Sequence, residues 1–237
     1  MNEFWNNYLS PGYYDKIFKK GEENQKGIQP NWHRSTFLKI SSLIKTGQFH
    51  LDYACGPGTF TGNFVDCKSV ATDISQNQID YATKTYGTKS EFIKLEDFNF
   101  ESYIGLFDSI TLIGLLEFID DETTVSLINK LHNLLKNEGI LILSTPNYGG
   151  LMYFLELFLN KFGRVSYKNQ HINRHSKVSL NKVLNKTEFS EINIQKHINF
   201  GIFSSFLGYK VADNLMNFID KAFNNFFGFI FIVELKK

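Results

Sequence analysis

Short apolar runs alternate with longer amphipathic ones from about residue 48 onward, and this alternation constrains the fold more than any other feature. Residues 59–67, 77–86 and 123–135 are predicted to form helices. Strands that alternate with helices build βαβ units, so the sequence predicts a parallel sheet with helices on both faces. The predicted buried strands are FHLDYA (49–54), SVATDI (69–74), EFIKL (91–95), LFDSITLI (106–113) and ILILST (140–145).

The rest of the chain is less regular. Residues 1–47 are predicted to form helices packed over the open end of the sheet, and residues 149–175 and 203–226 two helical excursions. A helix over 176–185 would have Ser176 or Ser179 as its N-cap, while 192–198 and 229–235 have strand patterns. With 237 residues and no repeat or low-complexity linker, the chain is predicted to form a single α/β domain.

Charge and cysteine content exclude several classes of protein. A formal net charge of +1 provides no broad basic field for binding a nucleic acid. Two cysteines do not make a disulfide framework, so a reducing, intracellular setting is the simpler interpretation. The N-terminus has no signal-peptide pattern, and no apolar run approaches the ~20 residues of a membrane span. A soluble, cytoplasmic protein is therefore predicted.

The chain contains 24 phenylalanines, many of them late in the sequence. LMYFLELFL (151–159) and FNNFFGFIFIVEL (223–235) are especially rich in large apolar side chains. Because most apolar stripes are core, the simpler interpretation is that these residues are buried. The alternative is an apolar wall that faces a hydrophobic substrate or makes a peripheral contact with a membrane.

The segment HLDYACGPGTF (50–60) places Gly56 and Gly58 directly after the first predicted strand. Glycines in a strand-to-helix turn let a ligand approach the main chain, and the helix start supplies free N–H groups. A dinucleotide fingerprint would have a third glycine at position 61, but Thr61 stands there and the glycine comes one residue late. This departure counts against a nicotinamide oxidoreductase.

Carboxylates stand at the same strand ends. Asp52 closes the first strand, and Asp73 closes the second, where a carboxylate can accept hydrogen bonds from both hydroxyls of a ribose. Glu96, Asp97 and Phe98 follow the third strand, near where an adenine would lie. The predicted crevice offers no lysine or arginine for a phosphate. This set fits a ligand with ribose, adenine and a cationic or zwitterionic tail.

Taken together, these motifs resemble those of class I S-adenosylmethionine-dependent methyltransferases. The matching segments are LDYACGPGTF, ATDIS, LEDFNF, FDSITLIGLLEFIDD and LLKNEGILILSTPN. The likeness covers roughly residues 28 to 145 well, with a weaker continuation to 198 and a similar final strand. The last two segments, with HINRHSKVSLNKVL, are similar to the small-molecule branch, which includes ubiquinone-type O-methyltransferases and glycan-cluster relatives.

The resemblance implies a doubly wound, mostly parallel seven-stranded Rossmann-like sheet with helices on both faces, an antiparallel last strand and helical cap insertions. Within the single domain 1–237 it implies an N-terminal helical lid (1–47), a cofactor-binding core (48–145) and caps over the acceptor pocket (149–175 and 203–226). The implied cofactor is S-adenosylmethionine, with S-adenosylhomocysteine as product, and no metal. The cofactor-binding residues that the resemblance implies are Asp52, Ala54, Cys55, Gly56, Gly58, Asp73, Ile74, Asp97, Phe98, Ile113, Gly114 and Arg34.

The implied roles differ along this set. Asp52 would orient the amino group of the methionine part, and Asp73 would bind the ribose hydroxyls. Asp97 and the main-chain N–H of Phe98 would bind the adenine. Arg34 would pair with the cofactor carboxylate, because arginine is a good bidentate partner for that group. An ordinary surface arginine of an N-terminal helix fits the sequence equally well.

Three residues are candidates for a base that assists methyl transfer to a hydroxyl acceptor: Glu117, His171 and His175. Phe118 stands where relatives commonly have a histidine, which removes one further base. His171 and His175 are four residues apart, but no third ligand stands at zinc spacing, so no metal site is predicted.

The segment LIGLLEF after the fourth strand lacks the Asn/Asp-Pro-Pro-aromatic motif of base-methylating enzymes. The predicted partner is therefore a small-molecule, glycan or lipid-linked acceptor and not a nucleic acid, and the predicted assembly is a monomer or homodimer. The main alternative is a cofactor-binding but non-catalytic module that acts as the partner of another subunit.

Overall fold

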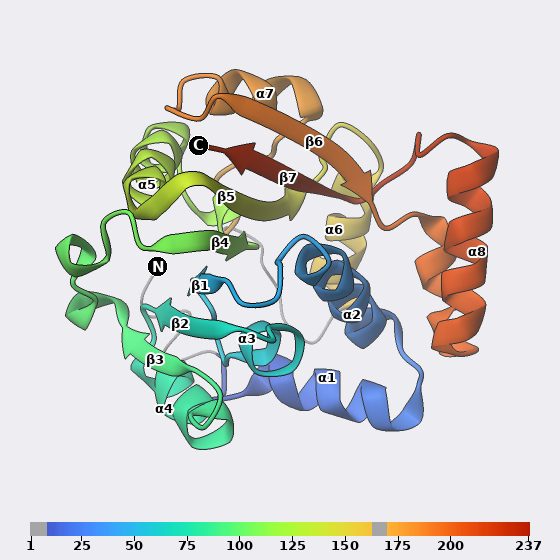
Figure 1. Ribbon diagram of the computed structural model, residues 1–237. Coiled ribbons are helices and arrows are strands. Elements are labelled where there is room, and N and C mark those ends of the chain that lie inside the picture. Colours follow the sequence, from blue (N-terminus) through green and yellow to red (C-terminus); the bar gives the residue numbers. More distant parts are fainter. Residues whose placement is uncertain (1–8, 163–169) are drawn as a thin grey trace.

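The computed structural model describes residues 9–162 and 170–237. Its seven-stranded sheet has the strand order β3-β2-β1-β4-β5-β7-β6 (Figure 1). Strand β7 runs antiparallel to both β5 and β6, and the other pairs are parallel, so the predicted mostly parallel sheet with an antiparallel last strand is confirmed. The strands are β1 (Phe49–Tyr53), β2 (Lys68–Asp73), β3 (Glu91–Lys94), β4 (Phe107–Ile113), β5 (Leu135–Pro146), β6 (Glu191–His197) and β7 (Ile230–Lys236).

Helices cover both faces of this sheet, as predicted for βαβ units. The α-helices are α1 (Tyr13–Asn24), α2 (Ile28–Ser41), α3 (Thr59–Phe64), α4 (Gln76–Tyr86), α5 (Asp121–Leu134), α6 (Met152–Phe162), α7 (Lys177–Leu184) and α8 (Tyr209–Ala222). Short 3₁₀ helices are η2 (Leu95–Asp97), η3 (Phe100–Tyr103), η4 (Leu116–Phe118) and η5 (Phe200–Phe206).

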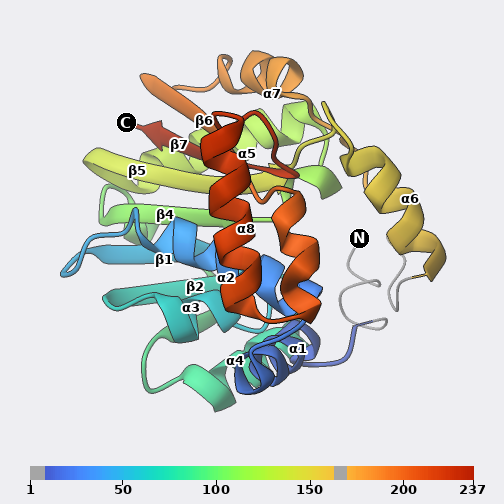
Figure 2. The same cartoon turned by 90° about the vertical axis from the view of Figure 1, so that its right-hand side faces the viewer.

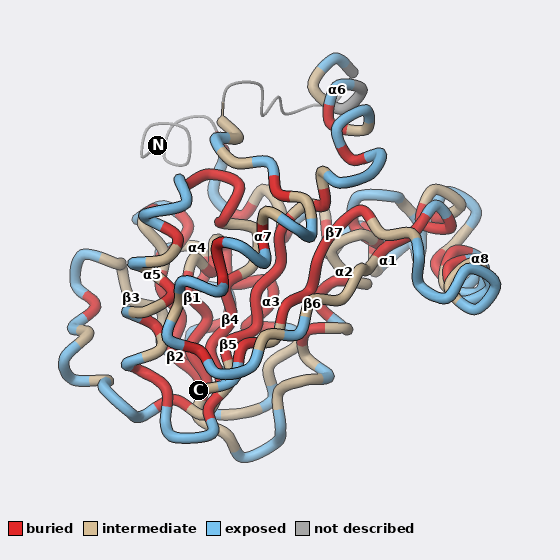
Figure 3. Tube along the Cα trace, turned by 90° about the horizontal axis from the view of Figure 1, so that it is seen from above, coloured by how far each residue is buried: buried red, intermediate tan, exposed pale blue. Residues whose placement is uncertain are grey.

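The side chains of the strands alternate between the two faces of the sheet and pack into two hydrophobic cores, one on each face. On one face, α5 and α7 bury Ile128, Leu131 and Leu180 against strand residues such as Leu51 and Leu112. On the other face, residues of α2, α3 and η5 form a second core together with residues of β5 and β7, and α8 lies outside them (Figure 2). Figure 3 shows the strands as the buried centre between these two layers. The central strands are thus inaccessible, and a ligand must reach the sheet at its ends.

Several boundaries differ from the predicted ones. Helix α3 ends at Phe64, three residues before the predicted end, because Val65 is already extended. Strand β5 begins at Leu135 and includes the predicted turn at 137–139 as an irregularity, in which Glu138 has a φ of 64°. Ser176 is the N-cap of α7, and its side chain accepts a hydrogen bond from the Ser179 N–H, which confirms one of the two predicted caps.

A buried carboxylate fixes α1 to the core. Asp15 is fully buried and accepts hydrogen bonds from the hydroxyls of Tyr81 (2.8 Å) and Tyr86 (2.6 Å) of α4. Its neighbour Lys19 forms an ion pair with it at 2.8 Å. The predicted helices of the N-terminal segment are present in its described part, and their role as a lid stays a prediction. Residues 1–8 of that segment lie outside the described residues.

The phenylalanine-rich segments divide into two groups. The core interpretation is confirmed for 229–235, where Phe229 and Phe231 are buried in β7 and its approach. It is wrong for Phe154, Phe223 and Phe226, which are exposed on α6 and just after α8. An apolar pattern alone does not show whether a partner element is available to cover every side chain, and these three remain exposed.

Candidate functional site

The turn after β1 is held by the carboxylate at the end of β2. Asp73 accepts a hydrogen bond from the Gly56 N–H on Oδ2 (2.9 Å) and one from the Ser75 N–H on Oδ1 (2.8 Å). Ala54, Gly56 and Gly58 all have positive φ, at 62°, 54° and 73°, so the turn has a left-handed backbone that glycine adopts without strain. The two predicted motifs therefore form one unit, since Asp73 joins the ends of neighbouring strands through the glycine turn.

The two glycines serve different purposes. A Cβ atom added at Gly56 would meet nothing within 4 Å, so the main chain there faces open space. At Gly58 the same atom would lie 2.7 Å from the Phe92 ring and 3.0 Å from Ala82, so this glycine lets the start of α3 pack against its neighbours. Gly56 matches the predicted close approach of a ligand, whereas the structure gives Gly58 a packing role.

Asp52 belongs to a buried polar network beneath α3. Its oxygens accept hydrogen bonds from the hydroxyls of Thr61 (2.5 Å) and Thr111 (2.8 Å), and burial raises its pKa to about 6. His50 lies between Ser109 (2.9 Å) and Thr111 (3.1 Å), and burial lowers its pKa to about 3. Sequence reasoning missed this network. The pairing of polar positions on β1 and β4 that builds it depends on the strand register.

The predicted adenine-side residues lie at the end of β3. Asp97 is exposed, and Ile74 is half-buried after β2. Phe98 is buried, and its ring stacks on Tyr103 at a centroid distance of 4.9 Å. The Phe98 N–H already donates to the Leu95 carbonyl at 3.3 Å. The Asp97 side chain is thus accessible to a ligand, while the predicted N–H donor has a partner within its own turn.

At the end of β4, Gly114 has a φ of 65° and follows the half-buried Ile113. The Gly114 N–H donates to the Ser144 carbonyl at 3.0 Å, which holds the turn against β5. Glu117 comes three residues later and is buried, and its Oε2 accepts a hydrogen bond from the Thr145 hydroxyl at 3.3 Å. Burial raises the pKa of Glu117 to about 7.

His171 lies in a cluster of polar side chains beside Glu117. Its Nδ1 lies 3.0 Å from the Tyr148 hydroxyl and 3.3 Å from Oε1 of Glu156. Arg174 donates to the same Glu156 oxygen at 3.1 Å. The main-chain oxygen of Glu117 accepts hydrogen bonds from the next two N–H groups after His171, at 2.8 and 3.1 Å, so the loop is tied to η4.

The pKa values in this cluster have clear causes. Burial lowers the pKa of His171, and the negative charge of Glu156 opposes that shift. Burial would raise the pKa of Glu156, but hydrogen bonds from Arg174 and Tyr148 outweigh it, and the pKa lies below its usual value. At neutral pH the cluster therefore holds a neutral imidazole beside an ionised carboxylate. Sequence reasoning predicted His171 and missed Tyr148, Glu156 and Arg174, because α6 brings Glu156 to the loop only in three dimensions.

The two other predicted residues have different environments. His175 is buried, and its Nε2 lies 3.7 Å from Oδ1 of Asp121, so its carboxylate partner differs from that of His171. No group of three or more metal-ligating side chains comes together within 9–162 and 170–237. Arg34 pairs with Asp213 of α8 at 3.0 Å and lies over the Tyr209 ring. Since its charge is engaged between α2 and α8, the structure does not support its predicted pairing with a cofactor carboxylate.

These strand-end features agree with a comparison of the sequence with protein families. The methyltransferase domain family matches residues 28–193, which is more than half of the chain. The chain belongs to this family. No curated protein matches the methyltransferase sequence significantly.

Solved structures share the fold of this methyltransferase over nearly all of its length. The plantazolicin methyltransferase BpumL, solved with SAH, is 18% identical, with 100% of this chain and 93% of that chain covered and a TM-score of 0.62. Magnesium protoporphyrin IX methyltransferase (ChlM) from Synechocystis PCC 6803, with bound SAH, is 14% identical, with 100% of this chain and 97% of that chain covered and a TM-score of 0.61. A SAM dependent methyltransferase from Archaeoglobus fulgidus is 16% identical, with 93% of this chain and 99% of that chain covered and a TM-score of 0.59. At these identities the likeness establishes the fold.

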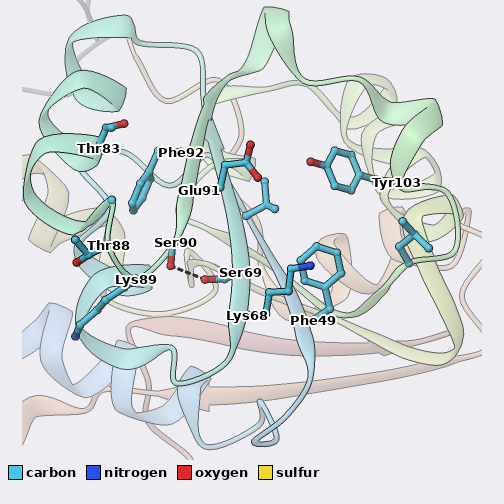
Figure 4. A pocket seen from close by; sticks show the side chains of 13 residues that line it. Phe49, Lys68, Ser69, Thr83, Thr88, Lys89, Ser90, Glu91, Phe92 and Tyr103 are labelled. Carbon is cyan, nitrogen blue, oxygen red and sulfur yellow. Dashed lines mark hydrogen bonds between the residues drawn. The ribbon is translucent and has the colours of Figure 1, made fainter.

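The methyltransferase also has a surface depression of about 680 Å³ at the amino ends of the strands, away from the predicted site. It is lined by the first residues of three strands, Phe49, Lys68 and Glu91, and by Phe92 and Tyr103 (Figure 4). A hydrogen bond of 2.5 Å between two serines, Ser69 and Ser90, crosses its floor. None of the predicted site residues lines this depression, which lies at the amino ends of the strands. In open α/β sheets ligands bind at the carboxyl ends.

Glu117→Gln is expected to flatten part of the pH dependence of stability of the methyltransferase. An acid whose folded pKa is raised contributes stability that is complete below about pH 4.5 and is lost as the pH rises through about 7. The contribution of Glu117 is on the order of 3 kcal/mol. Urea denaturation at pH 5 and pH 8 should therefore show a smaller loss between the two pH values in the variant.

The matched control is Glu122→Gln, because Glu122 is exposed at the start of α5. This variant should keep the pH dependence of the wild type. Equal pH dependence of Glu117→Gln and the wild type would contradict the raised pKa of Glu117.

Proposed function

We propose that this methyltransferase uses S-adenosylmethionine as methyl donor and transfers the methyl group to an oxygen of a small-molecule, glycan or lipid-linked acceptor. The observation that carries the donor assignment is the bond between the Asp73 carboxylate and the glycine turn. Both Asp73 oxygens accept main-chain N–H groups, and a carboxylate oxygen can accept from more than one donor, so ribose hydroxyls could bind there as well. The open space at Gly56 would admit the rest of the ligand.

The donor-binding residues would be those around this unit. Asp73 would accept the ribose hydroxyls, and the accessible Asp97 and Ile74 would lie beside the adenine. Ile113 and Gly114, at the end of β4, would lie along the methionine chain. When bound, S-adenosylmethionine supplies an electrophilic methyl group attached to a good leaving group. The protein would then mainly align the acceptor and exclude water.

His171 is the base that we propose for a hydroxyl acceptor. Its lowered pKa leaves the imidazole neutral and able to accept a proton near pH 7. Glu156 would stabilise the imidazolium that forms, and Arg174 holds Glu156 in place. Glu117 is the second candidate, since its raised pKa also lies near neutral pH. Helix α6, which supplies Glu156, extends from the end of β5 and would form one wall of the acceptor site (Figure 2).

Calorimetry with S-adenosylhomocysteine tests the donor assignment. The wild type is expected to bind S-adenosylhomocysteine and to give no heat with NAD, since the turn lacks the third glycine of a dinucleotide site. Binding of NAD without binding of S-adenosylhomocysteine would refute the proposal. Methyl transfer itself is then tested with labelled S-adenosylmethionine and candidate hydroxyl acceptors, because a non-catalytic module would bind the donor without turnover.

Glu156→Gln is expected to lower the pKa of His171 further, because it removes the charge that opposes the effect of burial. NMR titration of the imidazole measures this pKa without any acceptor, with His171→Asn to assign the signal. Asp121→Asn is the matched control, since Asp121 faces His175 instead. It should lower the pKa of His175 and leave that of His171 unchanged. If Glu156→Gln also left the pKa of His171 unchanged, Glu156 would not be its electrostatic partner.

A further inference from the structure

Seven large apolar side chains are exposed between Phe206 and Phe226, and we call this surface the α8 face. Three of them, Val211, Leu215 and Phe218, have the spacing i, i+4, i+7 and so lie on one side of the helix. Figure 1 shows α8 at the outer edge of the molecule, and Figure 3 shows its outward residues as exposed. The members of the α8 face are Phe206, Leu207, Val211, Leu215, Phe218, Phe223 and Phe226.

The exposure of the α8 face is not the result of a loosely attached helix. Tyr209, Ala212 and Met216 are buried on the inner side of α8. Gly201 of η5 allows a close approach, since a Cβ atom there would lie 2.5 Å from the Met216 nitrogen. The Asn199 side-chain amide also donates to the Met216 carbonyl at 2.8 Å. The helix is therefore docked by one side, and its second apolar side remains uncovered.

The charges around the α8 face are sorted by sign. Between 206 and 226 the exposed charged residues are Lys210 and Lys221. The two acids of the segment are engaged on the inner side, Asp213 with Arg34 (3.0 Å) and Asp220 with Asn199 (2.7 Å). Outside the segment, Lys196 places its Nζ 4.8 Å from the Phe226 ring. The exposed charges beside these large apolar side chains are therefore positive, and the two half-buried acids already have partners.

We propose that the α8 face docks this protein on an anionic lipid bilayer, with α8 lying in the plane of the interface. Aromatic and aliphatic side chains would enter the headgroup region, and the lysines would contact the negative lipids. A second copy of the chain fits less well, because a two-fold contact of this face would bring like charges together. No helix in the described part of the chain is long and apolar enough to cross a membrane. The inference is independent of the proposed methyl acceptor.

Vesicle co-sedimentation of the full chain tests this proposal. Vesicles of phosphatidylcholine with a minority of phosphatidylglycerol should bind the wild type. Binding should be weaker at higher salt concentration, and weaker to vesicles of pure phosphatidylcholine. The double variant Val211→Ser/Phe218→Ser should lower the vesicle affinity at least about tenfold, because it removes two inserted side chains. Lys210→Gln/Lys221→Gln should lower it roughly 10- to 30-fold on anionic vesicles.

Phe154→Ser on α6 is the matched control, because Phe154 is 65% exposed and Phe218 is 66% exposed. It should keep the wild-type affinity within about threefold. All substituted residues are exposed, and thermal unfolding of each variant would check that it is folded. The proposal is overturned if the wild type does not bind anionic vesicles, or if Phe154→Ser causes the loss instead. It is also overturned if Val211→Ser/Phe218→Ser binds vesicles like the wild type. The same holds if this variant only changes the protein from a dimer to a monomer in the absence of vesicles, because the α8 face would then be a subunit interface.

Discussion

Asp73→Ala is expected to weaken the binding of S-adenosylhomocysteine by about 100-fold. In the proposed site the Asp73 carboxylate would accept hydrogen bonds from the two ribose hydroxyls, so its loss would remove two charge-assisted hydrogen bonds. At about 1.5 kcal/mol each, these bonds correspond to two decades of affinity. The substitution also removes the acceptor of the Gly56 N–H at 2.9 Å, and the glycine turn loses its anchor to β2. Isothermal titration calorimetry measures the change directly.

The control for this prediction is Asp80→Ala on α4. Asp80 is an exposed acid that accepts a hydrogen bond from Gln76, away from the glycine turn. It should leave the affinity unchanged within a factor of two or so. A folded Asp73→Ala protein that binds S-adenosylhomocysteine as tightly as the wild type would refute the assigned role of Asp73.

Asp15→Ala is expected to lower the free energy of unfolding by about 3–5 kcal/mol, which is the range for removing one partner of a buried charged network. Asp15 is fully buried and accepts hydrogen bonds from Tyr81 and Tyr86. Without it, the hydroxyls of the buried Tyr86 and the half-buried Tyr81 lose their acceptor, and Lys19 loses its ion pair at 2.8 Å. Urea denaturation at neutral pH measures this loss.

Glu23→Ala on the same helix is the control, because Glu23 is exposed. Its effect should stay within about 0.5 kcal/mol. If the global stability of Asp15→Ala fell by less than about 1 kcal/mol, Asp15 would not be the residue that fixes α1 to the core. Hydrogen exchange over α1 then shows whether the helix has detached locally.

The strands were the most predictable elements of this fold. A buried parallel strand is a short run of apolar residues, and the central runs of the sequence became β1, β2 and β4 within one or two residues. The helix ends were less predictable. Helix α3 ends at Phe64 because the chain turns toward β2 there. Strand β5 includes the residues of a predicted turn, because Glu138 adopts a left-handed backbone conformation within it. These ends depend on contacts with distant elements.

The candidate site was predictable where its residues belong to local motifs. The glycine turn and Asp73 stand at strand ends that a parallel sheet brings together, so their meeting follows from the strand pattern. The partner of Arg34 was not predicted, because an arginine on a helix offers no sequence signal for the side on which it finds a carboxylate. In the structure that carboxylate is Asp213, which lies 179 residues later in the chain.

By itself, the sequence determined the strand-and-helix alternation, the glycine turn and the acids at the strand ends, because each of these depends on neighbouring residues and on backbone geometry. Only the tertiary structure decided which polar groups became partners. It joined Glu156 to His171, Asp52 to Thr61 and Thr111, and Asp15 to two tyrosines of α4. It also decided that one apolar side of α8 would stay uncovered. The physical reason is the same in each case: a buried polar group or an apolar stripe requires a partner, but the identity of that partner depends on how distant elements pack.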